Sequence, residues 1–143
     1  MTLIDFYAQV DDKLQTACRI TAKARSQGLR VTLFCADSAT AARLDRMLWT
    51  EPATGFLPHC RSDDRLAPTT PIVIDVSGKT PTHDEVLINL HPERPEYFSR
   101  FQRLAEIVST DEEDRTRARE RYKFYRDRGY ELRTHDLSGK SPP

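Results

Sequence analysis

Cationic side chains gather on one face of a helix predicted near the end of the chain. At 100° per residue, five residues fall within an arc of roughly 100°: Arg115, Arg119, Tyr122, Lys123 and Arg126. Arginine forks bind carboxylates through paired hydrogen bonds, and Tyr122 would offer an apolar wall beside them. The stripe therefore suits an acidic peptide. The alternative is a solvated helix face whose tyrosines pack on the core, since charged helix faces are common.

The positive charge of this stripe is local. The segment 115–133 has eight Lys or Arg against three Asp or Glu, whereas the whole chain has 22 of each kind. A neutral protein has no general attraction for nucleic acid or for an anionic membrane. A site for single-stranded DNA would also need several stacking aromatics along a groove, and this face supplies one. Direct binding of single-stranded DNA is kept as an alternative.

A second candidate surface begins at Trp49, which ends a predicted amphipathic helix. Phe56, Leu57, Pro58 and His59 follow in a stretch rich in turn-forming residues. Large aromatic side chains outside regular elements are typical anchors of protein interfaces. Burial of these side chains under the sheet is equally compatible with the sequence, because tryptophan is usually well buried.

Catalytic patterns are missing from the sequence. None of the five glycines falls in G-x-G-x-x-G or G-x4-G-K-[ST], and no G-x-S-x-G elbow is present. The turn Ala36-Asp37-Ser38 would hold a carboxylate where a phosphate would bind. We therefore expect no active site and no cofactor. A small nucleotide-handling enzyme on the same kind of sheet is the alternative.

Cysteine usage and hydropathy bound the chemistry further. Cys18, Cys35 and Cys60 form an odd, widely spaced set, so we expect no disulfide framework and a reducing compartment. His59 beside Cys60 lacks a second paired ligand motif, so we expect no zinc site. No stretch approaches the roughly 20 apolar residues that span a bilayer. A cytoplasmic protein without membrane contact is expected.

Hydrophobic periodicity predicts an α/β fold. Strands are predicted at 3–10, 30–35, 71–76, 86–90, 104–108 and 130–137, the last at an edge, and helices at 11–28, 37–52 and 110–128. Thr110 with Glu113 predicts a capping box at the third helix, residues 61–70 a loop, and 98–101 a helical turn. The pattern indicates a single Rossmann-like domain over 1–137, with a mostly parallel sheet flanked by helices, and a frayed tail over 138–143.

Short segments of the chain resemble a known family when they are taken in order. They are Phe6-Tyr7, Arg30-Val31 with Cys35, Leu44-Asp45, Leu48-Trp49, Phe56-Leu57-Pro58-His59, Leu87-Ile88-Asn89-Leu90, Ala118 to Lys123, Tyr125-Arg126 and Gly129-Tyr130. No single piece is a strong motif, but their order and spacing from Phe6 to Leu132 resemble the chi subunit of bacterial DNA polymerase III.

This resemblance implies a replication adaptor with no catalytic step of its own. Members of the family pair with the psi subunit, as a heterodimer within the clamp-loader assembly of the polymerase. They also bind the acidic C-terminal tail of single-stranded-DNA-binding protein. The resemblance thus implies a protein of the replisome that meets nucleic acid only indirectly and takes part in nucleotidyl transfer only by association.

Two residue sets follow from the resemblance by position. The psi-facing set is Trp49, Phe56, Pro58 and His59. The tail-binding set is Val108, Arg115, Arg119, Tyr122 and Lys123. The resemblance implies that Val108 and Tyr122 enclose a terminal aromatic side chain. Arg119 and Lys123 would then hold its α-carboxylate, and Arg115 the acids before it.

Overall fold

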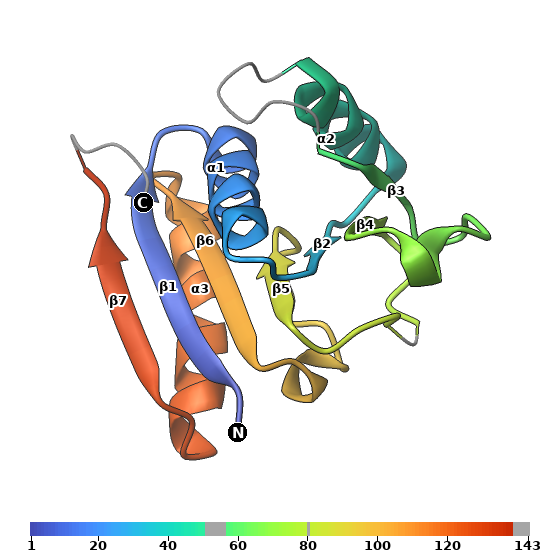
Figure 1. Ribbon diagram of the computed structural model, residues 1–143. Coiled ribbons are helices and arrows are strands. Elements are labelled where there is room, and N and C mark those ends of the chain that lie inside the picture. The colour runs from blue at the N-terminus through green and yellow to red at the C-terminus, as the bar shows by residue number, and fades with distance from the viewer. Residues whose placement is uncertain (51–56, 80, 139–143) are drawn as a thin grey trace.

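A seven-stranded sheet, parallel throughout, organises the described part of the chain (Figure 1). The structure is a computed structural model and describes residues 1–50, 57–79 and 81–138. The strand order is β3 (His59–Arg61), β4 (Ile72–Asp75), β2 (Val31–Phe34), β5 (Val86–Asn89), β6 (Arg103–Ser109), β1 (Leu3–Val10) and β7 (Leu132–Asp136). The expected single-domain α/β class is confirmed, and β7 is an edge strand as predicted.

The central strands are apolar along their whole length because both faces are covered. Every residue of β2 and β5 is buried, as is typical of parallel strands flanked by other layers. The N-terminal strand lies near the far end of the sheet, where Ile4 pairs with Leu104 of β6 on one side and Leu132 of β7 on the other. Residues from both ends of the chain therefore build this part of the sheet.

Helices cover the two faces unequally. Helices α1 (Lys13–Ser26) and α2 (Ser38–Thr50) lie on one face, and α3 (Glu112–Asp127) lies on the other behind β1 and β6 (Figure 1). Two short 3-10 turns, η1 (Ala67–Thr69) and η2 (Phe98–Arg100), complete the described elements. The second of them is the helical turn expected at 98–101.

Each face has its own core. On the α1 and α2 side the core is aliphatic and includes Leu33, Leu44 and Ile88, together with the buried Cys18 and Cys35. On the α3 side it is aromatic and includes Phe6, Phe98, Phe101 and Tyr125. The packing of α3 thus depends on aromatic rings contributed by β1 and by the segment before β6.

The start of α3 differs from the predicted capping box. The N-cap is Asp111, whose carboxylate accepts a hydrogen bond from the Asp114 amide at 3.1 Å, so the assignment of Thr110 as cap was wrong. The Asp114 carboxylate turns back to accept from the Ser109 amide at 2.8 Å and the Ser109 hydroxyl at 2.9 Å. This second carboxylate, rather than Glu113, fastens the end of β6 to the helix.

The predicted loop at 61–70 also needs correction. Arg61 is the last residue of β3, and residues 67–69 form η1. The strand was missed because all three of its residues are only half-buried and none is strongly apolar. The proposed helix stop at Pro52 and nearly all of the tail 138–143 lie outside the described residues. None of the helices in the described ranges has the length and apolar character needed to cross a bilayer.

Candidate partner-binding sites

A cavity of about 310 Å³ opens where α3 crosses the β1, β6 and β7 end of the sheet. We call it the α3 cavity. Its lining residues are Phe6, Ala8, Gln9, Val108, Ser109, Arg115, Ala118, Arg119, Tyr122 and Thr134. Strands β1 and β6 supply the floor of the cavity, and α3 supplies one wall. Residues from both halves of the chain therefore meet in one site.

The floor of the α3 cavity is apolar and rigidly packed. The rings of Phe6 and Tyr122 meet edge to face with centroids 5.2 Å apart. Phe6, Val108 and Ala118 are each at most 5% exposed, so the core holds them in place. An apolar side chain that enters such a site gains roughly 25 cal/mol for each Å² it removes from water. The site can therefore anchor one aromatic or aliphatic group.

A bulge in β1 shapes the rim of the cavity. The pairing of β1 with β6 shifts register between Tyr7 and Val10, and Gln9 between them has φ +61°. Bulges re-aim side chains and are frequent beside functional sites. The bulge places Ala8 and Gln9 on the cavity, and both were missed in the sequence, where strict alternation through Val10 was assumed.

Arginines stand on the helix side of the same cavity. Arg115 and Arg119 lie one turn apart on α3 and line it, with Arg119 exposed. Of the five residues assigned to a tail site, the structure brings together Val108, Arg115, Arg119 and Tyr122. Lys123 is exposed on the adjoining surface of α3 and is not among the lining residues. The arrangement places positive charge beside an apolar pocket.

One member of the counted basic segment faces inward. Arg121 is 5% exposed, and its Nε donates to Glu106 at 3.0 Å. Tyr125 and Asn89 also donate to this carboxylate, at 2.7 and 3.1 Å. Burial raises the pKa of Glu106 even though these donors favour its charged form. Arg121 thus joins α3 to β6 and contributes nothing to a binding face.

The second candidate surface lies at the opposite edge of the sheet, beside β3. Trp49 is 57% exposed, and its ring meets the His59 ring edge to face with centroids 4.9 Å apart. The His59 Nδ1–H donates to the Leu57 carbonyl at 2.6 Å, and the Nε2 atom lies 3.0 Å from Asp45 Oδ1. Pro58, the residue before His59, is exposed. Phe56 lies outside the described residues.

We call the exposed pair Trp49 and Pro58 the tryptophan surface; the His59 side chain, also predicted to face psi, is fully buried beside it. The Nδ1 hydrogen bond to the main chain holds the imidazole, so the tryptophan has a fixed neighbour. Asp45 lies close to Nε2, but this atom has no hydrogen-bond partner among the described residues. Leu57, in contrast, is 7% exposed and belongs to the core. The structure therefore buries Leu57 and the His59 ring and leaves Pro58 exposed, with Trp49 of α2 as the exposed aromatic side chain.

The carboxyl edge of the sheet, where α/β enzymes commonly bind phosphates, is closed to anions at the helix starts. Each of the three described helices has an aspartate at its N-terminus that accepts from one of the free backbone amides and places a negative charge there. Asp12 accepts from Gln15, Asp37 from Thr40 and Asp111 from Asp114, at 3.1, 2.7 and 3.1 Å. Among the described residues no group of three or more His, Cys, Asp or Glu is placed to hold a metal ion.

Comparison with known proteins points to one family. The family profile described as "DNA polymerase III chi subunit, HolC" matches residues 1–133. A curated protein of Pseudomonas aeruginosa named "DNA polymerase III subunit chi" is 37% identical over 141 residues, which cover 96% of this chain and 98% of the relative. Proteins of the same name from Haemophilus influenzae and Escherichia coli are 33% and 31% identical, over 86% and 93% of this chain and 86% and 89% of the relatives.

Proposed function

The chain belongs to the DNA polymerase III chi subunit family, and from that premise we propose that it is a non-catalytic replication adaptor with two binding surfaces. The α3 cavity binds the acidic C-terminal tail of single-stranded-DNA-binding protein. The tryptophan surface pairs with the psi subunit of the clamp loader. The protein thereby links the polymerase assembly to coated template and meets DNA only through its partners.

The observation that most supports tail binding is the combination of an apolar pocket with an arginine rim. A terminal aromatic ring fits against Phe6, Val108 and Tyr122, which form a preorganised floor. Arg119 and Lys123 then hold the α-carboxylate of that residue, and Arg115 attracts the acids before it. Each part of a tail that is apolar at its end and acidic upstream has a matching group.

Affinity should be moderate and sensitive to salt. Exposed ion pairs contribute about 0 to 1 kcal/mol each, because water and mobile ions screen them. The larger share must come from the buried ring and from the carboxylate that is desolvated beside it. Loss of the terminal carboxylate should therefore cost more than loss of any single upstream acid.

The experiment is calorimetric titration with an acidic peptide that ends in Pro-Phe, as the free acid and as the C-terminal amide, at two salt concentrations. The free acid should bind, and higher salt should weaken it. The amide should bind at least about tenfold less tightly, which corresponds to roughly 1.4 kcal/mol. Arg119→Ala should weaken binding to a similar degree without changing the melting temperature.

Arg65→Ala is the matched control, because Arg65 is an exposed arginine in the turn that follows β3. It should leave the affinity for the peptide unchanged. If the free acid and the amide bind equally, or if a folded sample binds neither, the α3 cavity is not a receptor for this tail.

The tryptophan surface supports the psi proposal through its exposed aromatic ring. Trp49 presents a large apolar side chain to solvent at the β3 edge, next to exposed Pro58. Buried tryptophans at the centre of an interface often contribute at least 2 kcal/mol to binding. Trp49 is the one tryptophan in the sequence, so its fluorescence reports on this surface alone.

The proposal of a non-catalytic role is supported by the helix starts. The donors that would hold a phosphate at the carboxyl edge of the sheet are used by Asp12, Asp37 and Asp111. A phosphate group at this edge would have to displace these carboxylates from the backbone amides or bind beside their negative charge. The geometry therefore argues against nucleotide chemistry at the carboxyl edge of this sheet.

A further inference from the structure

One end of the sheet has no helix over it on the α1 side. Helix α1 lies over β5 and β6, and in Figure 1 no described helix lies in front of β1 and β7. Parallel sheets are normally covered on both faces by apolar layers. Here the uncovered face bears Asp5, Tyr7, Arg103, Arg133 and His135. This departure from the usual pattern marks a polar surface that the proposed adaptor role does not use.

Asp5 organises the cations on this face. Its carboxylate accepts from Arg133 at 2.8 and 3.1 Å and from His135 at 2.9 Å, and Arg103 approaches to 3.5 Å. Burial alone would raise the pKa of Asp5, but the hydrogen bonds from Arg133 and His135 lower it, so the carboxylate stays charged. The hydrogen bonds of the Asp5 carboxylate are thereby satisfied. The outer sides of the Arg103 and Arg133 guanidiniums stay open to solvent, since each side chain is nearly half exposed.

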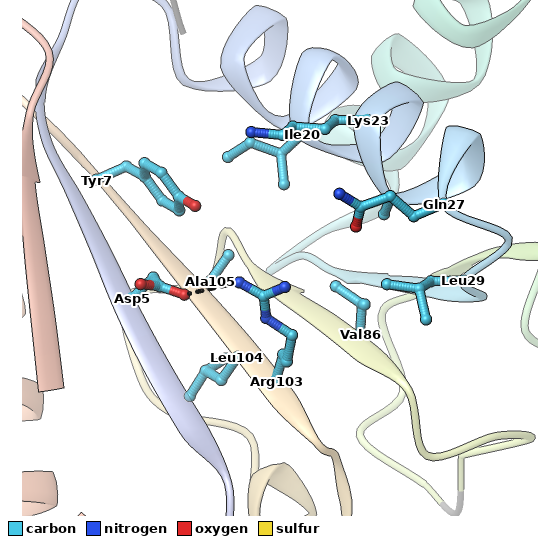
Figure 2. Close-up of a pocket in the computed structure, with 11 residues that line it drawn as sticks. Asp5, Tyr7, Ile20, Lys23, Gln27, Leu29, Val86, Arg103, Leu104 and Ala105 are labelled. Carbon is cyan, nitrogen blue, oxygen red and sulfur yellow. Dashed lines mark hydrogen bonds and ion pairs between the residues drawn. The ribbon is translucent and has the colours of Figure 1, made fainter. Parts of the chain in front are cut away.

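A cavity of about 200 Å³ lies between this cluster and the last two turns of α1. We call it the α1 cavity. In Figure 2 the Tyr7 hydroxyl and the Arg103 guanidinium point into it from the sheet, while Lys23 and Gln27 border it from the helix. The apolar remainder of the lining includes Ile20, Leu29, Val86, Leu104 and Ala105. Donors thus surround a small space with an apolar floor.

The groups around the α1 cavity favour an anion. Among the lining residues Lys23 and Arg103 are cationic, and Asp5, already bound by three partners, is the one acid. Burial and the nearby Asp5 raise the pKa of Tyr7, so its hydroxyl remains a donor at neutral pH. The last carbonyls of α1 would repel an anion, but Ala24 and Arg25 accept from the amides of Gln27 and Gly28.

We propose that the α1 cavity binds the phosphate group of a small phosphate ester. Four side chains from β1, β6 and the end of α1 can donate to it, namely Tyr7, Lys23, Gln27 and Arg103, and a phosphate group has three oxygens to accept from them. Lys23 and Arg103, the second only loosely bound to Asp5 at 3.5 Å, supply two positive charges that match a dianion. The volume is below the roughly 300 Å³ of ordinary ligand sites, so the ester carries only a small body or a mononucleotide held by its phosphate.

The test is an NMR titration of the full ¹⁵N-labelled chain with inorganic phosphate, thymidine 5′-monophosphate and acetate, at constant ionic strength set with sodium chloride. Phosphate and the nucleotide should produce saturable shifts at the amides of Tyr7, Lys23 and Arg103. Acetate should produce much smaller ones. Tighter binding of the nucleotide than of phosphate would assign the ester body to the apolar floor, and equal binding would assign the site to free phosphate.

Two variants and a control decide the assignment. Arg103→Gln should weaken phosphate binding about tenfold, the effect of losing one charged hydrogen bond. Tyr7→Phe removes one donor while keeping the ring that stacks on His135 at 4.8 Å, and should weaken binding less. Arg65→Gln, an exposed arginine in the turn after β3, should change nothing. Absence of saturable shifts, equal response to acetate, or equal effects of Arg103→Gln and Arg65→Gln would overturn the proposal.

Discussion

A single buried carboxylate holds together three loops at the carboxyl end of β4. Asp75 is 3% exposed. Its Oδ1 accepts from the hydroxyls of Ser62 and Ser77, both at 2.7 Å, and from the Ser77 amide at 2.9 Å. Its Oδ2 accepts from the Tyr97 hydroxyl at 2.6 Å and from the Gly78 amide at 3.3 Å. The charge is therefore dispersed over five donors from separate segments.

The replacement Asp75→Asn should lower the free energy of unfolding by about 2 kcal/mol at neutral pH, since charged hydrogen bonds contribute about 1.5 to 3 kcal/mol. Burial opposes ionisation, but the bonds from Tyr97, Ser77 and Ser62 lower the pKa of Asp75 below its ordinary 3.8. That stabilisation is complete above the unfolded-state pKa and is lost as pH falls through the folded-state pKa. The difference between the wild type and the variant should therefore shrink at acid pH.

Urea unfolding at pH 7, 5 and 3 measures this difference. The control is Asp63→Asn, because Asp63 is an exposed carboxylate in the adjoining turn. It should change the free energy of unfolding by less than about 0.5 kcal/mol at each pH, as surface replacements generally do. A deficit for Asp75→Asn that stays constant from pH 7 to pH 3 would contradict the charge argument.

Individual residues also show what the sequence could and could not reveal. Spacing on α3 correctly grouped Arg115, Arg119 and Tyr122, because helical periodicity alone fixes which residues share a face. It could not exclude Arg121, whose partner Glu106 lies fifteen residues earlier in a strand whose interior is otherwise apolar. The pairing depends on how β6 and α3 are placed relative to each other, and this placement is not encoded in local pattern.

At the scale of elements, the junction between β6 and α3 determines where the arginine face points. Asp111 caps the helix, while the Asp114 carboxylate binds Ser109 and also accepts from Lys13 of α1 at 3.1 Å. The first turn of α3 is thereby tied both to its own preceding strand and to the start of a helix on the other face of the sheet. This junction fixes the position of Arg115 at the rim of the α3 cavity.

Two alanine variants distinguish the observed cap from the predicted one. Asp111→Ala should lower the free energy of unfolding by about 1 kcal/mol, since the Asp114 amide loses its acceptor. Thr110→Ala should change it by less than about 0.5 kcal/mol. Chemical unfolding of both variants at neutral pH measures the difference. The reverse order of effects would restore Thr110 as the cap.

Most elements were predictable because their patterns are strong. Buried strands such as β2 and β5 are mostly apolar runs, and Gly28 and Gly129, with φ of +78° and +82°, lie just after α1 and α3, close to the predicted helix ends. Strand β3 was not predictable, because His59, Cys60 and Arg61 have no apolar alternation and form a strand only by pairing with β4. The bulge at Gln9 was missed for a similar reason, since it arises from pairing with β6.

At the scale of the whole molecule, the two proposed partner surfaces lie at opposite ends of the sheet. The α3 cavity adjoins β7, and the tryptophan surface adjoins β3, with five strands between these two edges. No residue lines both surfaces, so binding at one does not obstruct the other. An adaptor that joins two assemblies requires this separation.

The two surfaces should therefore bind their partners independently. Quenching or a shift of Trp49 fluorescence during titration with psi should give the same dissociation constant, within about twofold, with and without saturating tail peptide. Trp49→Ala should weaken psi binding by at least about 30-fold, a loss of roughly 2 kcal/mol, and leave peptide binding unchanged. Arg119→Ala should do the reverse. Displacement of psi by the peptide would show that the surfaces overlap.

The placement of β1 has a consequence for how the protein is made. Asp5 contacts Arg103 and Arg133, which follow it by 98 and 128 residues. The ribosome therefore releases β1 long before its neighbours β6 and β7, so this strand has no partner in the sheet until they have been made. Such long-range pairing slows folding and exposes an open strand to other nascent chains. The β1 residues that line the α1 cavity or the α3 cavity are thus synthesised long before the strands that complete those sites.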